Sequence, residues 1–136
     1  MKFASVRLVT GDPASVDTLV SFYARLTGIS ATRPVPDFAE MRFAGLVLAI
    51  STERMVQQFN SGAARAAANR SAILEFEVDD VDALYQRLGE ATLDTAMPPT
   101  TMPWGNRSLL LRDPDGNVVN VFSRPTAQLQ DAPHAA

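Results

Sequence analysis

Two long stretches of the chain show the same order of hydrophobic and polar positions. Residues 3–10 alternate apolar and polar side chains, as a half-buried strand does, and residues 73–78 form a second strand-like segment. Each is followed by apolar residues at helical spacing, within 13–27 in the first stretch and 81–88 in the second. The pattern therefore predicts a strand and then an amphipathic helix in both halves.

Both predicted helices carry residues that are typical of helix ends. Asp12, followed by a proline, is a natural N-cap, and Asp79-Asp80 precede the second helix. Gly28 and Gly89 follow the last apolar positions and close the C-terminal ends of the two helices.

Shorter apolar segments predict the remaining strands. Residues 38–43 and 46–51 indicate two strands joined by a tight connection, while Pro34 and Pro36 limit any strand before them to a short or edge strand. Residues 92–97 predict another short strand, ending before a Pro-Pro pair.

Residues 102–123 predict a β-hairpin around the turn Asp113-Pro114-Asp115-Gly116-Asn117. The proline pre-sets φ, Asp113 accepts a hydrogen bond from the backbone ahead of it, and the Asp-Gly pair tolerates positive φ. The first arm follows Trp104, the only tryptophan, and the second arm carries one polar residue, Asn120, within an apolar run.

The second half repeats the first with a period of about 70 residues, too long for a solenoid unit. Tyr-x-Arg-Leu recurs near the end of each helix, and the elements follow in the same order. We therefore predict an α+β fold of two tandem βαβββ modules, forming a curled mixed sheet around a concave cavity. The predicted boundaries within a single domain of 1–136 are module 1 at about 3–52, a linker with one helical piece at 53–70, module 2 at about 71–123 and a tail at 124–136.

Composition excludes several functions. The net charge of −3 argues against nucleic acid as a partner, and the absence of cysteine removes disulfides and thiolate chemistry. No apolar run is long enough to span a membrane, so we expect a cytoplasmic, soluble protein. The only histidine, His134, lies near the C-terminus, which leaves the body of the domain without histidine for acid–base catalysis or metal binding.

Residues 76–84 (Phe-Glu-Val-Asp-Asp-Val-Asp-Ala-Leu) and 112–117 (Arg-Asp-Pro-Asp-Gly-Asn), with the paired βαβββ order, resemble the vicinal oxygen chelate superfamily. This superfamily includes glyoxalases, extradiol dioxygenases and bleomycin-resistance proteins, and the resemblance covers about residues 3–123.

The resemblance also implies where metal ligands would lie, on the first and last strands of each module. The internal repeat places these positions at Ser5, Ala49, Ile73 and Asn120. Alanine and isoleucine cannot bind a metal, and serine and asparagine are weak neutral donors. We therefore expect no metal, no other cofactor and no catalytic residue of the family's usual type.

The segment Pro103-Trp104-Gly105, followed by Arg107, resembles the metal-free bleomycin-resistance branch, whose members are homodimers that hold a planar drug in a groove between subunits. That resemblance implies that Trp104 stacks on a ligand. Packing of Trp104 in the core or at a dimer interface is the competing interpretation. Arg107 either clamps an acidic group of the ligand or covers the tryptophan ring.

Three polar residues are further candidates. Asn120 occupies a ligand position, where it either bonds a bound molecule or bonds a neighbouring strand or water. Arg7 and Glu75 occupy matching places in the two modules and by alternation should face the cavity. They either neutralise one another or leave Glu75 available for a cationic ligand.

The apolar candidates Phe38, Phe43 and Met102 lie on segments that border the expected concave face, where they contact either ligand or core. The sequence thus favours metal-independent binding and sequestration of a small aromatic or planar molecule, such as an antibiotic, by a homodimer. The alternatives are a lyase, isomerase or dioxygenase-like enzyme of the same fold with Glu75 as general base, and a partner-binding module without a small ligand.

Overall fold

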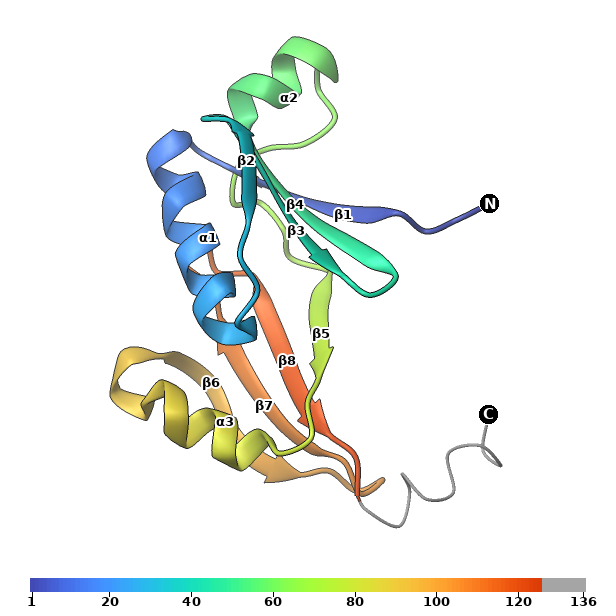
Figure 1. The fold of residues 1–136 in the computed structure, drawn as a ribbon, viewed down its shortest axis with the longest axis vertical. Helices are drawn as coiled ribbons and strands as arrows, with labels where there is room; N and C mark the ends of the chain where they lie inside the picture. Colours follow the sequence, from blue (N-terminus) through green and yellow to red (C-terminus); the bar gives the residue numbers. More distant parts are fainter. Residues whose placement is uncertain (126–136) are drawn as a thin grey trace. The chain divides into compact units, whose positions relative to one another are not determined.

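The computed structural model describes residues 1–125, which fold into two compact units (Figure 1). The first unit comprises residues 1–70 together with 114–116, and the second comprises residues 71–113 and the chain from 117 onward. Of the predicted tail at 124–136, residues 126–136 lie outside the described residues.

The first unit is one βαβββ module followed by a short helix. Its sheet has the strand order β1-β4-β3-β2, with β1 and β4 parallel and the other pairs antiparallel. Its elements are β1 (Ser5–Thr10), α1 (Pro13–Thr27), β2 (Thr32–Val35), β3 (Phe38–Phe43), β4 (Leu46–Thr52) and α2 (Glu53–Phe59).

The second unit repeats this topology. Its sheet has the order β5-β8-β7-β6, again with the first and last strands of the module parallel. Its elements are β5 (Ile73–Glu77), α3 (Val81–Leu88), a 3-10 turn η1 (Glu90–Thr92), β6 (Asp94–Thr101), β7 (Arg107–Arg112) and β8 (Val118–Ser123). The predicted α+β class is therefore confirmed, as two mixed four-stranded sheets built from βαβββ modules.

Each sheet buries one face against the helix of its own module. In the first sheet this face carries Leu8, Ile50 and Met41, and the opposing helix contributes Leu19 and Tyr23, all almost fully buried. Because side chains alternate along a strand, the positions between these residues point to the other side of the sheet.

The second unit has a core of the same kind. Leu109, Leu111, Val119 and Val121 are fully buried on the face of the sheet that α3 contacts. The Tyr85 hydroxyl is 3.2 Å from Thr95 Oγ1, which links α3 to the edge strand β6.

The helix ends form as predicted from the sequence. The Asp12 carboxylate accepts a hydrogen bond from the Ser15 amide at 2.8 Å, and Asp80 accepts one from Ala83 at 3.0 Å. These bonds satisfy amides that have no partner within the helix. Gly28 ends α1 in the left-handed conformation, with φ of 74°.

One sequence-based expectation needs correction. The strand predicted to end before the Pro-Pro pair continues through it, because β6 is an edge strand whose pairing with β7 is irregular between Thr95 and Thr100. Proline is tolerated where a strand needs no amide for its ladder. The helical piece of the linker is α2, which begins directly after β4 with Thr52 as its N-cap.

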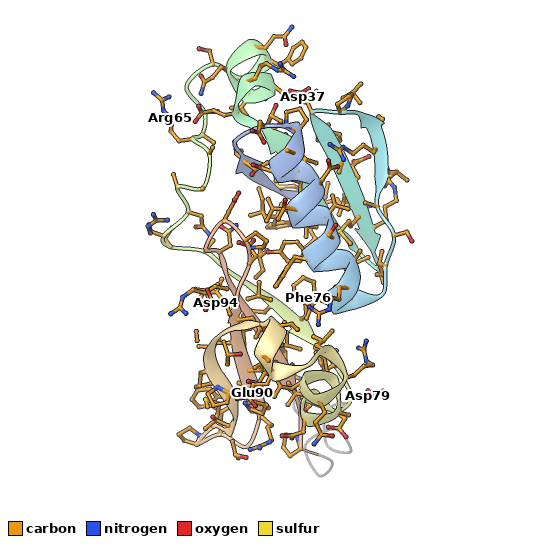
Figure 2. The ribbon with its side chains drawn as sticks, turned by 90° about the vertical axis from the view of Figure 1, so that its left-hand side faces the viewer. Asp37, Arg65, Phe76, Asp79, Glu90 and Asp94 are labelled. Atoms are coloured by element: carbon orange, nitrogen blue, oxygen red, sulfur yellow. The ribbon has the colours of Figure 1, made fainter. Side chains whose placement is uncertain are left out.

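Asp37 joins the turn between β2 and β3 to the start of α2, and Figure 2 labels it beside this helix. Its carboxylate accepts bonds from Arg54 Nε at 2.9 Å and Nη2 at 2.6 Å, and from the Thr52 hydroxyl at 2.6 Å. The hydrogen bonds from Arg54, and to a smaller extent from Thr52, hold the pKa of Asp37 below its ordinary value.

Among residues 1–125, no helix is long and apolar enough to cross a membrane.

The turn between β7 and β8 has the predicted construction. The Asn117 amide donates to Asp113 Oδ1 at 2.9 Å, and the Asn117 side chain donates to Asp113 Oδ2 at 2.7 Å. Gly116 has a φ of +83°, a conformation that disfavours any residue with a Cβ atom.

We predict that Gly116→Ala lowers the free energy of unfolding by about 1 kcal/mol, because alanine is strained at this φ although the space around it is open. Urea denaturation measures the change. Gly11→Ala is the matched control, because Gly11 has no positive φ and a Cβ there meets only Ser15 Oγ, at 3.7 Å. Equal stability losses in both variants would contradict the prediction.

Candidate functional site

In the second sheet, the face opposite α3, called the distal face below, carries the polar candidates. Side chains at alternate positions point to this face, and paired residues on neighbouring strands share it. One row across the sheet runs Glu75 (β5), Asn120 (β8), Leu110 (β7) and Met97 (β6). Two of the predicted polar residues, Glu75 and Asn120, are therefore direct neighbours.

Asn120 and Glu75 are joined by a hydrogen bond. The Asn120 Nδ2 group donates to Glu75 Oε2 at 2.8 Å. The other side-chain atom of Asn120, Oδ1, is buried and has no hydrogen-bond partner within residues 1–125. Asn120 thus bonds a neighbouring strand, one of the two interpretations of the sequence, and it also keeps a free acceptor.

The remaining charges on the distal face are paired with each other. Arg112 contacts Asp94 at 3.1 Å, and Arg124 contacts Glu77 at 3.4 Å while its guanidinium lies 5.6 Å from the centre of the Phe122 ring. Among the described residues, Glu75 is the carboxylate on this face without a cationic partner.

The first sheet places Arg7 at the position that corresponds to Glu75. Arg7 is in register with Ala49, as Glu75 is with Asn120, and Ala49 is in register with Glu40 on β3. The guanidinium of Arg7 donates to the Asn60 side chain at 3.0 Å, within the first unit. The sequence pattern gave no signal for Asn60, because this residue follows α2 in a segment without periodicity.

Two apolar candidates lie on opposite faces of the first sheet. Phe38 is in register with Ser51 and shares the face of Arg7, whereas Phe43 pairs with Leu46 and shares the face that α1 covers. Phe43 thus faces the core, one of its two predicted surroundings, because it lies five positions from Phe38 along β3 and side chains alternate between the two faces. The hydroxyl of Ser51 is buried without a partner within residues 1–125.

Trp104 lies in the connection between β6 and β7 and is 66% exposed. The connection is a tight turn in which the Met102 amide donates to the Asn106 carbonyl at 2.7 Å and the Gly105 amide to the Met102 carbonyl at 2.9 Å. Met102 is half-buried within this turn. Because its side chain is exposed, Trp104 lies outside the core of its own unit.

Arg107 does not lie with Asn120 and Glu75. It shares the face of Leu109 and Leu111, where it forms two hydrogen bonds to Asp82 of α3, at 2.7 and 3.0 Å. These bonds hold the pKa of Asp82 below its ordinary value of 3.8. A third bond, at 3.1 Å, goes to the Thr101 hydroxyl. Arg107 therefore links α3 to the sheet, and its contact with a ligand stays a prediction.

The side chains at the four positions where the resemblance implies metal ligands do not suit a divalent ion. Ser5 and Ile73 lie at the exposed starts of β1 and β5, Ala49 is buried in β4, and the amide of Asn120 is bonded to Glu75. Within residues 1–125, no group of three or more His, Cys, Asp or Glu side chains could hold a metal. A divalent ion needs more anionic or imidazole ligands than this set provides.

The sequence matches the Glyoxalase/Bleomycin resistance protein/Dioxygenase superfamily over residues 2–121. The chain belongs to this superfamily. No curated protein matches it significantly.

Solved structures of the superfamily have the same fold. A glyoxalase-related enzyme from Fulvimarina pelagi is 23% identical with a TM-score of 0.76, over 92% of this chain and 89% of that one. A glyoxalase/bleomycin resistance protein/dioxygenase family enzyme from Burkholderia phytofirmans PsJN is 18% identical with a TM-score of 0.76, over 92% and 100% of the two chains. A glyoxalase/bleomycin resistance protein/dioxygenase from Nocardioides is 22% identical with a TM-score of 0.74, over 93% and 85%.

We predict that the contribution of the Asp82–Arg107 pair to stability is present near neutral pH and is lost on acidification. A carboxyl whose pKa is lowered by folding stabilises the folded state above its unfolded pKa, and this effect disappears as the pH falls through the lower, folded value. Asp82→Asn should therefore be less stable than the wild type at about pH 7 and nearly equal to it at about pH 2.

Chemical denaturation across this pH range measures the difference. The control is Glu90→Gln, which removes one exposed carboxylate of the same unit (Figure 2) without removing an ion pair. Because both partners of the Asp82–Arg107 pair are partly exposed, added salt should also reduce the effect at neutral pH. A destabilisation by Asp82→Asn that stays constant from neutral to acidic pH would show that the ion pair is not its cause.

Proposed function

We propose that this chain binds a small, flat aromatic molecule without a metal ion and acts by sequestering it. One observation carries the proposal: at a position where the superfamily places a metal ligand, the chain has Asn120, hydrogen-bonded to Glu75 and with a free acceptor. The side chains at this position are arranged for hydrogen bonding to an organic molecule rather than for ion coordination.

The exposed Trp104 supports the same function. A large aromatic ring exposed on a tight turn offers a flat surface, and aromatic stacking contributes about 0.5–1.5 kcal/mol beyond the burial of area. Trp104 precedes β7, which starts at Arg107. Leu110, the β7 residue in the row of Asn120, lies three steps further along the strand, about 10 Å at about 3.4 Å per step. Protection of a host from a planar antibiotic, by a homodimer of this chain, is the biological role that we propose.

We predict that protein purified without a tag or chelator contains far less than one equivalent of any transition metal. Elemental analysis by mass spectrometry measures zinc, iron, nickel and manganese together. The physical reason is the neutral donor set at Ser5, Ala49, Ile73 and Asn120, which does not offset the dehydration of a divalent ion. One bound equivalent of any of these metals would contradict metal-independent binding.

We predict that flat aromatic compounds quench the fluorescence of Trp104 and that Trp104→Ala weakens their binding roughly tenfold or more. A suitable panel contains acridine, 9-aminoacridine and anthraquinone-2-sulfonate. Since the variant lacks tryptophan, isothermal titration calorimetry measures affinity in both proteins.

The matched control is Phe59→Ala, because Phe59 is an aromatic residue with the same exposed fraction, 66%, located on α2. It should change affinity by less than about twofold, and both variants should remain within about 0.5 kcal/mol of wild-type stability. If no member of the panel quenches the wild-type protein, or if Trp104→Ala binds as tightly as the wild type, the proposed stacking is wrong.

A further inference from the structure

The Glu75 carboxylate fixes the orientation of the Asn120 amide. A carboxylate only accepts hydrogen bonds, so the amide must direct its NH₂ group toward Glu75 Oε2, and the 2.8 Å distance agrees with such a bond. The amide oxygen Oδ1 then points away from Glu75. There it is buried without a donor from residues 1–125, which is costly for a polar atom.

The pair therefore presents two acceptors that receive no hydrogen bond from residues 1–125. Asn120 Oδ1 is one acceptor, and Glu75 Oε1, which receives no hydrogen bond from the described residues, is the second. The neighbouring guanidinium groups of Arg112 and Arg124 are occupied by Asp94 and Glu77. The group that complements this arrangement carries two or more N–H donors and a positive charge.

The rest of the row is apolar. Next to Asn120 lie Leu110 and then Met97, both half-buried, on the two following strands. With strands about 4.8 Å apart, the row from β5 to β6 spans about 14 Å, which is long enough for a molecule of two or three fused rings. At one end of this row, Glu75 and Asn120 provide a carboxylate and hydrogen-bond acceptors. At the other end, Leu110 and Met97 provide an apolar surface of methyl, methylene and thioether groups.

We propose that the preferred ligand is a planar aromatic cation, whose amine or amidine N–H groups bond Glu75 and Asn120 and whose rings lie on Leu110 and Met97. This inference rests on the proposed function and specifies the ligand class of the same site. It assigns Glu75 as the residue that selects the charge of the ligand. Asn120 acts with it as a second acceptor.

The experiment compares two probes that share one ring system and differ in charge, 9-aminoacridine (cation) and acridine-9-carboxylate (anion). Isothermal titration calorimetry at neutral pH and low salt gives both affinities. The wild type should bind the cation roughly tenfold tighter or more, and this preference should decrease with added salt. In Glu75→Gln the two affinities should become nearly equal.

Glu77→Gln is the matched control, because it removes the same charge two residues away on the same strand and face, from a carboxylate that already has a partner. It should retain most of the preference for the cation. Asn120→Leu should weaken binding of the cation while leaving the affinity for the anion almost unchanged, since it removes the acceptor and keeps the size of the side chain. Circular dichroism of each variant confirms that its fold is retained.

The outcomes separate this inference from the function on which it rests. Suppose that the wild type binds both acridines equally well and that Trp104→Ala binds neither. This result would support the proposed function and overturn the preference for a cation. A preference of the wild type that survives in Glu75→Gln would also overturn it. If neither acridine binds, the cation proposal is contradicted, while the proposed function is judged by the wider Trp104 panel.

Discussion

The parallel pairing of the first and last strands in each module is the constraint on which the structure depends. β1 pairs with β4 and β5 with β8, so residues that are 42 or 45 positions apart in sequence, such as Arg7 and Ala49 or Glu75 and Asn120, become neighbours. A parallel pair needs a long connection, and the helix with two further strands provides it. The helix covers one face of the sheet, and the alternate positions of the paired strands point to the other face.

Much of the fold could be predicted because its signals are local. Caps at Asp12 and Asp80, the glycine that ends α1 and the turn at Asp113 each depend on hydrogen bonds within four residues. Sequence patterns report such bonds directly. The continuation of β6 through two prolines could not be predicted in this way, since it depends on the strand being at the edge of its sheet with irregular pairing.

The candidate site was less predictable, because partners of side chains come from distant segments. The sequence predicted that Glu75 and Asn120 face the same side, but it could not show that the two are bonded, which depends on the register of β5 with β8. The partner of Arg107 could not be predicted for the same reason. Its place after the tryptophan suggested a ligand contact, whereas strand alternation turns it toward Asp82, 25 residues earlier.

The hydrogen bond between Asn120 and Glu75 also constrains what the two side chains offer on the distal face. A carboxylate accepts hydrogen bonds, so the Asn120 Nδ2 group points to Glu75 and the amide oxygen points away from it. The strand pairing that brings Glu75 beside Asn120 therefore places a carboxylate next to an amide oxygen that has no donor among residues 1–125. The proposed recognition of an organic cation follows from this pairing of acceptors.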